Sequence, residues 1–105
     1  MEKKYFLLKL IPPRLTFSQD MSDEERNIML QHIAYWTKVF DEGKSIIFGP
    51  VLDPKGSWGL GIVEVNDESE VKELTSNDPV IKANRNFSYE IYPVMVGKVR
   101  QLISN

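Results

Sequence analysis

The stretch Tyr5-Phe-Leu-Leu-Lys-Leu-Ile11 is apolar at almost every position, and Pro12-Pro13 follows it directly. Proline has no backbone N–H to donate to a neighbouring strand, so this pair ends a predicted strand at Ile11. A strand with one face in water alternates apolar and polar residues. This one is apolar in both alternating sets, namely Tyr5, Leu7 and Ile11, and Phe6, Leu8 and Leu10. The pattern predicts a strand in a sheet that is covered on both faces.

The sequence after this strand alternates between helix and strand patterns. Ser22 and Glu25 have capping-box spacing, which predicts a long helix that ends near Glu42, with Gly43 at its left-handed terminus. The other expected elements are a polar-aromatic loop over 14–21, a strand over 45–52, a type I turn over 53–56, a strand over 58–65, a helix over about 67–76, a further capped turn at 78–79 and a strand over 87–93. The tail after Pro93 has room for a last helix or strand.

The predicted order of elements is β-α-β-β-α-β, which is the split βαβ or ferredoxin-like motif. Crossover handedness then places two helices on one face of a four-stranded antiparallel sheet, giving an α+β fold. We treat residues 1–95 as one domain and residues 96–105 as a C-terminal extension of it.

The second face of this sheet also needs a cover. The strand over 45–52 is again apolar in both alternating sets, and two helices can cover only one face. A second copy packed sheet to sheet is the economical solution, so we expect a homodimer. In the alternative, the short C-terminal tail folds over this face.

Composition excludes several classes of function. There are 13 Lys and Arg against 15 Asp and Glu, so the chain lacks the positive charge with which proteins bind nucleic acid. The absence of cysteine rules out disulfides, thiolate catalysis and cysteine-ligated zinc. A single histidine rules out a site with several histidines in one subunit. We therefore expect no metal and no cofactor.

We expect a soluble, cytoplasmic protein without a membrane partner. No apolar run approaches the roughly 20 residues of a membrane-spanning helix. Met1 to Lys4 lead into a strand rather than into a signal peptide.

His32 is the first candidate for chemistry. At about 100° per residue, Ile28, Met29, Ile33, Trp36, Val39 and Phe40 share one arc of the long helix, and His32 falls inside it. The simplest interpretation is a core histidine whose ring is satisfied by a backbone carbonyl. In the functional interpretation, an imidazole in a partly apolar pocket acts as general base or acid near neutral pH. Trp36, on the same arc, would then line the pocket.

Asp78 is the second candidate. Aspartate before proline is a common helix cap and needs no catalytic meaning. A carboxylate has two oxygens, however, so one can cap the helix while the other accepts a hydrogen bond from an imidazole. Asp78 and His32 would then form a dyad in which the carboxylate sets the tautomer of the ring.

The further candidates for contacts with a small ligand are Gly49, Pro50, Ser57, Trp58 and Arg14. Gly49-Pro50 closes the second strand, and Gly59 and Gly61 alternate in the third, where glycine marks a bulge, close packing or a nearby ligand. Ser57 and Trp58 either line a pocket or form the shoulder of a hairpin. Arg14 either binds a carboxylate through its guanidinium or lies in solvent.

Three motifs together resemble one known family. Gln31-His32, Phe48-Gly49-Pro50 and Asp78-Pro79-Val80 occur in an order and spacing similar to the YciI-like, or YCII-related, domain. The resemblance covers Tyr5 to about Pro93. It implies a dimeric α/β barrel built from two ferredoxin-like sheets, and a His-Asp site that falls on His32 and Asp78.

The resemblance also implies a class of chemistry. Some related proteins isomerise small, often cyclic or aromatic-derived metabolites, or act on them by elimination such as dehydrochlorination. The extended 12–20 loop and the tail beyond Pro93 depart from the shortest members and would reshape the pocket. We therefore weigh two hypotheses: a homodimeric, cofactor-independent lyase or isomerase that uses His32 and Asp78, and a non-catalytic protein that holds a small molecule in the same pocket.

Overall fold

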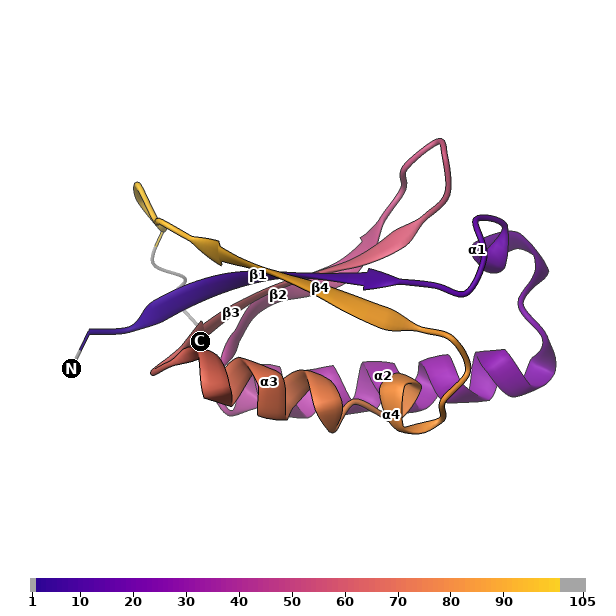
Figure 1. Ribbon diagram of the computed structural model, residues 1–105, viewed down its shortest axis with the longest axis horizontal. Helices are drawn as coiled ribbons and strands as arrows, with labels where there is room; N and C mark the ends of the chain where they lie inside the picture. The colour runs from indigo at the N-terminus through magenta and orange to yellow at the C-terminus, as the bar shows by residue number, and fades with distance from the viewer. Residues whose placement is uncertain (1, 101–105) are drawn as a thin grey trace.

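The computed structural model describes residues 2–100 as one sheet with helices packed against it (Figure 1). The strands are β1 (Lys4–Ile11), β2 (Ser45–Val51), β3 (Trp58–Val65) and β4 (Ser88–Val94). The helices are α1 (Phe17–Asp20), α2 (Asp23–Asp41), α3 (Glu68–Ser76) and α4 (Pro79–Lys82).

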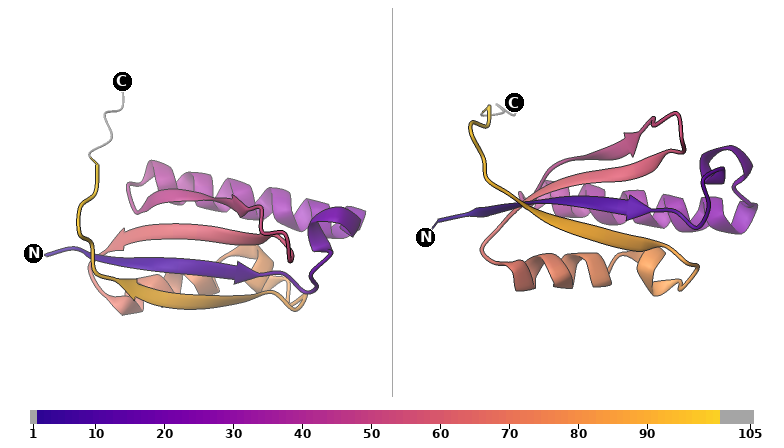
Figure 2. Two further views of the ribbon diagram at one scale, coloured as in Figure 1. Left: turned by 90° about the horizontal axis from the view of Figure 1, so that it is seen from above. Right: turned by 45° about the horizontal axis from the view of Figure 1, so that its top comes forward.

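The strands pair in the order β2-β3-β1-β4, and each neighbouring pair is antiparallel. The predicted α+β class and the four-stranded antiparallel sheet are confirmed, and the strand order is compatible with the ferredoxin-like motif. In Figure 1 the sheet forms an upper layer and α2, α3 and α4 form a lower one. Viewed from above, the strands lie in front of these helices (Figure 2).

The core lies between the sheet and the two longer helices. Alternate residues of β1, namely Phe6, Leu8 and Leu10, are at most 4% exposed because they face α2 and α3. Phe6 and Leu8 pack in a cluster with Trp36 and Val39 of α2, Val63 and Val65 of β3, and Val71 and Leu74 of α3. Burial of these side chains is the main force that holds the layers together.

The predicted signals at the two ends of the long helix are confirmed. The Ser22 hydroxyl accepts from the Glu25 N–H while the Glu25 carboxylate accepts from the Ser22 N–H, which completes the capping box. Gly43 follows the helix with φ +85°, a left-handed conformation that glycine adopts without a steric cost. The turn over 53–56 closes through a hydrogen bond from the Gly56 N–H to the Asp53 carbonyl.

The segment over 14–21, expected to be a loop throughout, contains the helical turn α1. Thr16 begins this turn: its carbonyl accepts from the N–H groups of Gln19 and Asp20, and its hydroxyl donates to the Asp20 carboxylate. A single turn has no room for the apolar periodicity by which a helix is recognised in a sequence. The described part of the chain therefore has four helices, whereas the ferredoxin-like prediction had two. The additional helices are α1, which was not predicted, and α4, which was predicted as a capped turn.

The C-terminal tail adds no regular element as far as the structure describes it. Residues 95–100 form neither helix nor strand, and Met95 is 97% exposed. Residues 101–105 of the predicted extension lie outside the described residues. Between residues 2 and 100, no helix has the length and the apolar character needed to cross a membrane.

Candidate functional site

A cavity of about 550 Å³ lies between the sheet and the middle of α2. It is at the end of the sheet where α1 and the β2–β3 hairpin lie (Figure 1). The helix contributes Met29, His32, Ile33 and Trp36, and the sheet contributes Leu8, Leu10, Phe48 and Tyr89. A volume of this size is typical of sites that bind small molecules.

Glycines of β3 form part of the cavity wall. In the strand register Gly59 lies opposite Leu10 and Gly61 opposite Leu8, so both glycines are on the face covered by the helices. A Cβ atom at Gly59 would be 3.0 Å from the Leu10 Cβ, whereas one at Gly61 would be 3.6 Å from the Leu8 Cβ, an ordinary contact. The missing side chains leave room for the cavity, as glycines in strands often do for a ligand.

His32 and Asp78 are in direct contact. The Nδ1 atom of His32 lies 2.8 Å from Oδ2 and 3.1 Å from Oδ1 of Asp78. Asp78 is fully buried and the His32 side chain is 13% exposed. An ionised carboxylate only accepts hydrogen bonds, so Nδ1 must carry the proton. This contact joins the middle of α2 to the start of α4.

Asp78 also caps α4, so its two predicted roles coexist. Its Oδ1 atom accepts from the Val80 N–H at 3.0 Å, and Pro79 occupies the first helical position. The cap uses Oδ1 and holds the carboxylate at the N-terminal end of the turn. The other oxygen, Oδ2, is therefore available to accept from His32. A helix-start signal in the sequence thus also positions a side chain of the candidate site.

Two further donors surround the Asp78 carboxylate. The indole N–H of Trp36 donates to Oδ2 at 2.8 Å, and the Tyr89 hydroxyl donates to the same atom at 2.5 Å. Trp36 was predicted to contact a ligand, and it does line the cavity. Its indole N–H, however, already donates to Asp78 and is not available to a ligand. Tyr89 was not among the residues predicted from the sequence. Its only signal was a tyrosine among the alternating apolar positions of β4.

These contacts keep Asp78 ionised although it is buried. Burial is the largest single influence and opposes the charge, but the hydrogen bond and charge of His32, together with the hydroxyl of Tyr89 and the indole of Trp36, outweigh it. The pKa of Asp78 is therefore below its usual value. Burial, followed by the Asp78 charge, raises the pKa of Tyr89, which remains a hydrogen-bond donor at neutral pH.

The second ring nitrogen of His32, Nε2, takes no part in the contact with Asp78. Within residues 2–100, no side chain or backbone group forms a hydrogen bond to Nε2, and His32 lines the cavity. Because Asp78 fixes the proton on Nδ1, Nε2 carries the lone pair. The arrangement is a base with one defined acceptor atom at the wall of an apolar cavity.

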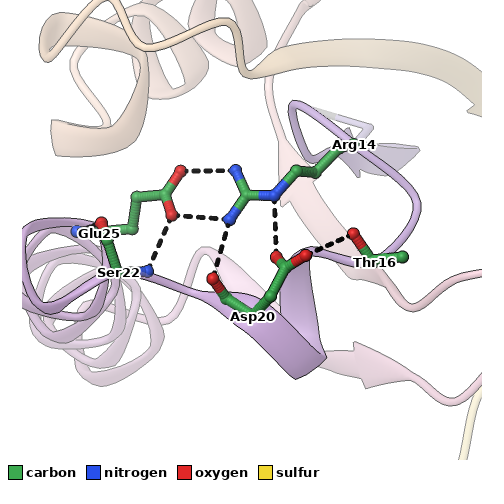
Figure 3. A network of polar contacts seen from close by, with 5 residues as sticks. All are labelled: Arg14, Thr16, Asp20, Ser22 and Glu25. Atoms are coloured by element: carbon green, nitrogen blue, oxygen red, sulfur yellow. Dashed lines mark hydrogen bonds and ion pairs between the residues drawn. The ribbon is translucent and has the colours of Figure 1, made fainter.

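Arg14 is engaged elsewhere (Figure 3). Its two terminal nitrogens donate to the two carboxylate oxygens of Glu25, each at 2.8 Å, and its Nε donates to Asp20, also at 2.8 Å. Paired in this way, the Glu25 carboxyl has a pKa lowered to about 2, mainly by Arg14 and then by the Ser22 N–H. Arg14 is not among the residues that line the cavity. Its bonds to Asp20 and Glu25 connect the α1 segment to the start of α2. We therefore do not include Arg14 among the proposed ligand contacts.

The remaining predicted contacts lie at the cavity. Gly49, Pro50, Ser57 and Trp58 all contribute to its lining. The Trp58 ring, however, packs under the Lys9 ammonium, 4.8 Å from the ring centroid, and its N–H faces Asp53 at 3.3 Å. Lys9 alternates with the buried Leu8 and Leu10, so this contact is on the face of the sheet opposite the helices. Among residues 2–100, no three His, Asp or Glu side chains are placed to hold a metal ion.

Comparisons with known proteins agree with the motifs and the fold. The family model described as the YCII-related domain matches residues 10–95, which is most of the chain. The chain belongs to the YCII-related domain family. This confirms the resemblance carried by Gln31-His32, Phe48-Gly49-Pro50 and Asp78-Pro79-Val80.

The fold of this YCII-related domain is also found among solved structures. An uncharacterized protein from Thermotoga maritima, TM1266, superposes with a TM-score of 0.54 at 8% sequence identity. The match covers 90% of this chain and 100% of that one. At this identity the similarity concerns the fold alone. None of the curated proteins matches the sequence.

Proposed function

We propose that this YCII-related protein is a cofactor-independent enzyme that carries out general acid–base chemistry, as a lyase or isomerase, on a small organic molecule. The observation that supports it is the arrangement around His32. A fully buried carboxylate holds Nδ1 at 2.8 Å, Nε2 has no hydrogen-bond partner among residues 2–100, and His32 lines a cavity of about 550 Å³. His32 is the catalytic residue of the proposal, and Asp78 is the residue that positions it.

The geometry supports a simple proton-transfer sequence. Nε2 removes a proton from a carbon atom next to an electron-withdrawing group, and the electron pair of the C–H bond moves into the substrate. Asp78 stabilises the imidazolium that forms, because its carboxylate stays within hydrogen-bond distance of Nδ1. In one outcome the substrate expels a leaving group, which departs from the neighbouring carbon with its bonding electron pair, and Nε2 passes the proton to that group or to water. In the other outcome the substrate takes the proton back from Nε2 at another carbon. The first outcome is an elimination and the second an isomerisation.

The tautomer of His32 tests this arrangement. We expect neutral His32 to carry its proton on Nδ1, because Asp78 can only accept there. His32 is the only histidine in the sequence, so the ring ¹⁵N signals in an NMR spectrum need no assignment by mutation. In Asp78→Asn the amide can donate to Nδ1, and the proton should move to Nε2. A native ring protonated on Nε2 would contradict the proposal.

We further propose that two copies of the chain pack sheet to sheet as a dimeric α/β barrel. Four apolar side chains form a row across the uncovered face, one from each strand: Ile47, Ile62, Leu7 and Tyr92. Ile47 and Tyr92 are 52% and 48% exposed. The tail does not bury its own apolar residues up to residue 100, since Met95 and Val99 are 97% and 55% exposed. These observations favour a second copy as the cover.

A charge on this face should separate the two copies. We expect Ile62→Glu to convert a dimer into a monomer, measured by sedimentation equilibrium at micromolar concentration. Ile62 faces away from α2 and α3, so the subunit should remain folded. Leu30→Glu is the control, because Leu30 is 60% exposed but lies on α2 rather than on the sheet. A native protein that sediments at the mass of one chain would refute the barrel.

The proposal includes a cytoplasmic location. In support, the chain has no cysteine and so makes no use of the disulfides that an oxidising compartment permits.

A further inference from the structure

The lining of the cavity has an unusual charge balance. Among residues 2–100, no Lys, Arg, Asp or Glu side chain contributes to it, and the titratable residues of the lining are His32 and Tyr89. Two other polar atoms are already used, because the Tyr89 hydroxyl and the Trp36 N–H both donate to Asp78. The side-chain groups left for a ligand are Nε2 of His32 and the hydroxyls of Ser18 and Ser57.

Two cations that lie beside residues of the lining, Arg14 at Phe17 and Lys9 at Trp58, are engaged outside this space. The Arg14 guanidinium is occupied by Glu25 and Asp20. Lys9 lies over the Trp58 ring on the opposite face of the sheet. An imidazolium at His32 would already be neutralised by Asp78, 2.8 Å from Nδ1. A bound carboxylate or phosphate would therefore lose its water shell without gaining a partner of opposite charge.

The rest of the wall is apolar. Phe17 comes from α1, Phe48 from β2 and Phe87 from the segment before β4, and Met21 and Met29 also line the cavity. Aromatic rings offer broad apolar surfaces, and the thioethers of methionine adapt to irregular shapes. Leu52 and Ile33 line the cavity yet are 82% and 48% exposed, so a ligand can enter beside them.

We infer that the ligand of this cavity is an uncharged, mainly apolar organic molecule with one polar group that reaches His32, and that the site discriminates against anions of the same shape. This inference rests on the proposed function only in naming Nε2 as the polar contact. The selection against charge follows from the lining. Burying a charge without a partner costs several kcal/mol, whereas burying an apolar ring is favourable.

A matched pair of probes tests the selection against charge. The molecules 2-naphthol and 2-naphthoate share one ring system, and at pH 7 the first is uncharged and the second an anion. We expect 2-naphthol to bind and 2-naphthoate to bind about 100-fold more weakly in isothermal titration calorimetry. Equal or tighter binding of 2-naphthoate overturns the inference. So does a failure of 2-naphthol to bind at millimolar concentration.

The variant Gly61→Val tests whether 2-naphthol binds in this cavity. A Cβ atom there makes only ordinary contact with Leu8, so Gly61→Val fills part of the space without a severe clash. We expect it to weaken 2-naphthol binding at least about tenfold. Gly97→Val is the control, because a Cβ at Gly97 has nothing within 4 Å and Gly97 does not line the cavity. Equal affinity in the two variants overturns the assignment. If Gly61→Val does not fold, the comparison of the two probes on the native protein still decides.

The ring signals of His32 separate this inference from the proposed function. If 2-naphthol binds and shifts these signals, both stand. If it binds and leaves them unchanged, the ligand class stands and the role of Nε2 fails. If 2-naphthoate binds preferentially and shifts them, the proposed function survives and the inference about charge does not.

Discussion

Asp78→Asn should lower the free energy of unfolding by about 3–5 kcal/mol, because it removes one partner of a buried charged pair. The carboxylate is fully buried and accepts from His32, Trp36, Tyr89 and the Val80 N–H. An asparagine has one acceptor oxygen and places an N–H₂ group among these donors. A domain of this size has about 5–15 kcal/mol of stability in total, so the loss should be plain in urea or thermal unfolding.

Asp67→Asn is the matched control for this prediction. Asp67 also caps a helix, accepting from the Glu70 N–H at 3.1 Å, but its side chain is exposed and has no partner in the core. Asparagine caps a helix about as well as aspartate, so this variant should unfold almost as the native protein does. If the two variants lost the same stability, Asp78 would be no more than a cap.

The same substitution should change the response to acid. Because the folded pKa of Asp78 is below its unfolded value, its stabilisation is present above about pH 4 and is lost as the pH falls through the folded pKa. The difference in stability between the native protein and Asp78→Asn should therefore shrink below pH 4. A difference that stayed constant down to pH 2 would contradict the ionised state of Asp78.

His32→Gln should slow proton abstraction by about 10²–10⁴-fold, the usual contribution of a positioned general base. The uncharged ring ketone 2-tetralone has acidic C–H groups, and exchange of these for deuterium in D₂O can be followed by NMR without knowledge of the natural substrate. Nε2 would take the proton, and the enolate would take up deuterium in return. Native protein should accelerate the exchange, and His32→Gln should remove most of the acceleration.

His32→Asn distinguishes a catalytic histidine from a structural one. Its shorter amide can place an N–H near the position of Nδ1 and so retain the hydrogen bond to Asp78, but it has no atom at the position of Nε2. This variant should keep most of the stability and lose the exchange activity. If His32→Gln exchanged 2-tetralone as fast as the native protein did, His32 would not be the catalytic base. If the native protein bound 2-tetralone and did not accelerate its exchange, the chain would be a binding protein rather than an enzyme.

Much of the fold could be predicted because its signals are local. The capping box of Ser22 and Glu25 and the left-handed Gly43 act within a few residues of the helix ends that they set. The apolar runs that form β1 and β2 end at prolines or turn residues close by in the chain, but they are apolar in both alternating sets, so only the structure shows which set faces the helices. Thr16 shows the limit of such signals, because the single turn that it begins is stabilised by hydrogen bonds without an apolar repeat.

The candidate site could be predicted only in part. His32 and Asp78 were identified as residue types in suitable places, but 46 positions separate them, and only the packing of α2 against α4 brings Nδ1 to the carboxylate. Tyr89 comes from a third element, and its hydroxyl carries no marker in the sequence. Arg14 resembled a ligand-binding arginine because its partners, Glu25 and Asp20, approach it only after the α1 segment folds back onto α2.

The sequence by itself therefore determined the order of strands and helices, the two-sided apolar character of the sheet and the family. Each depends on neighbours in the chain or on short motifs. Tertiary structure alone decided which polar groups meet in the interior, that the glycines of β3 open a cavity beside His32, and that no charged side chain lines it. These properties depend on side chains from distant segments, and their positions follow from how the layers pack.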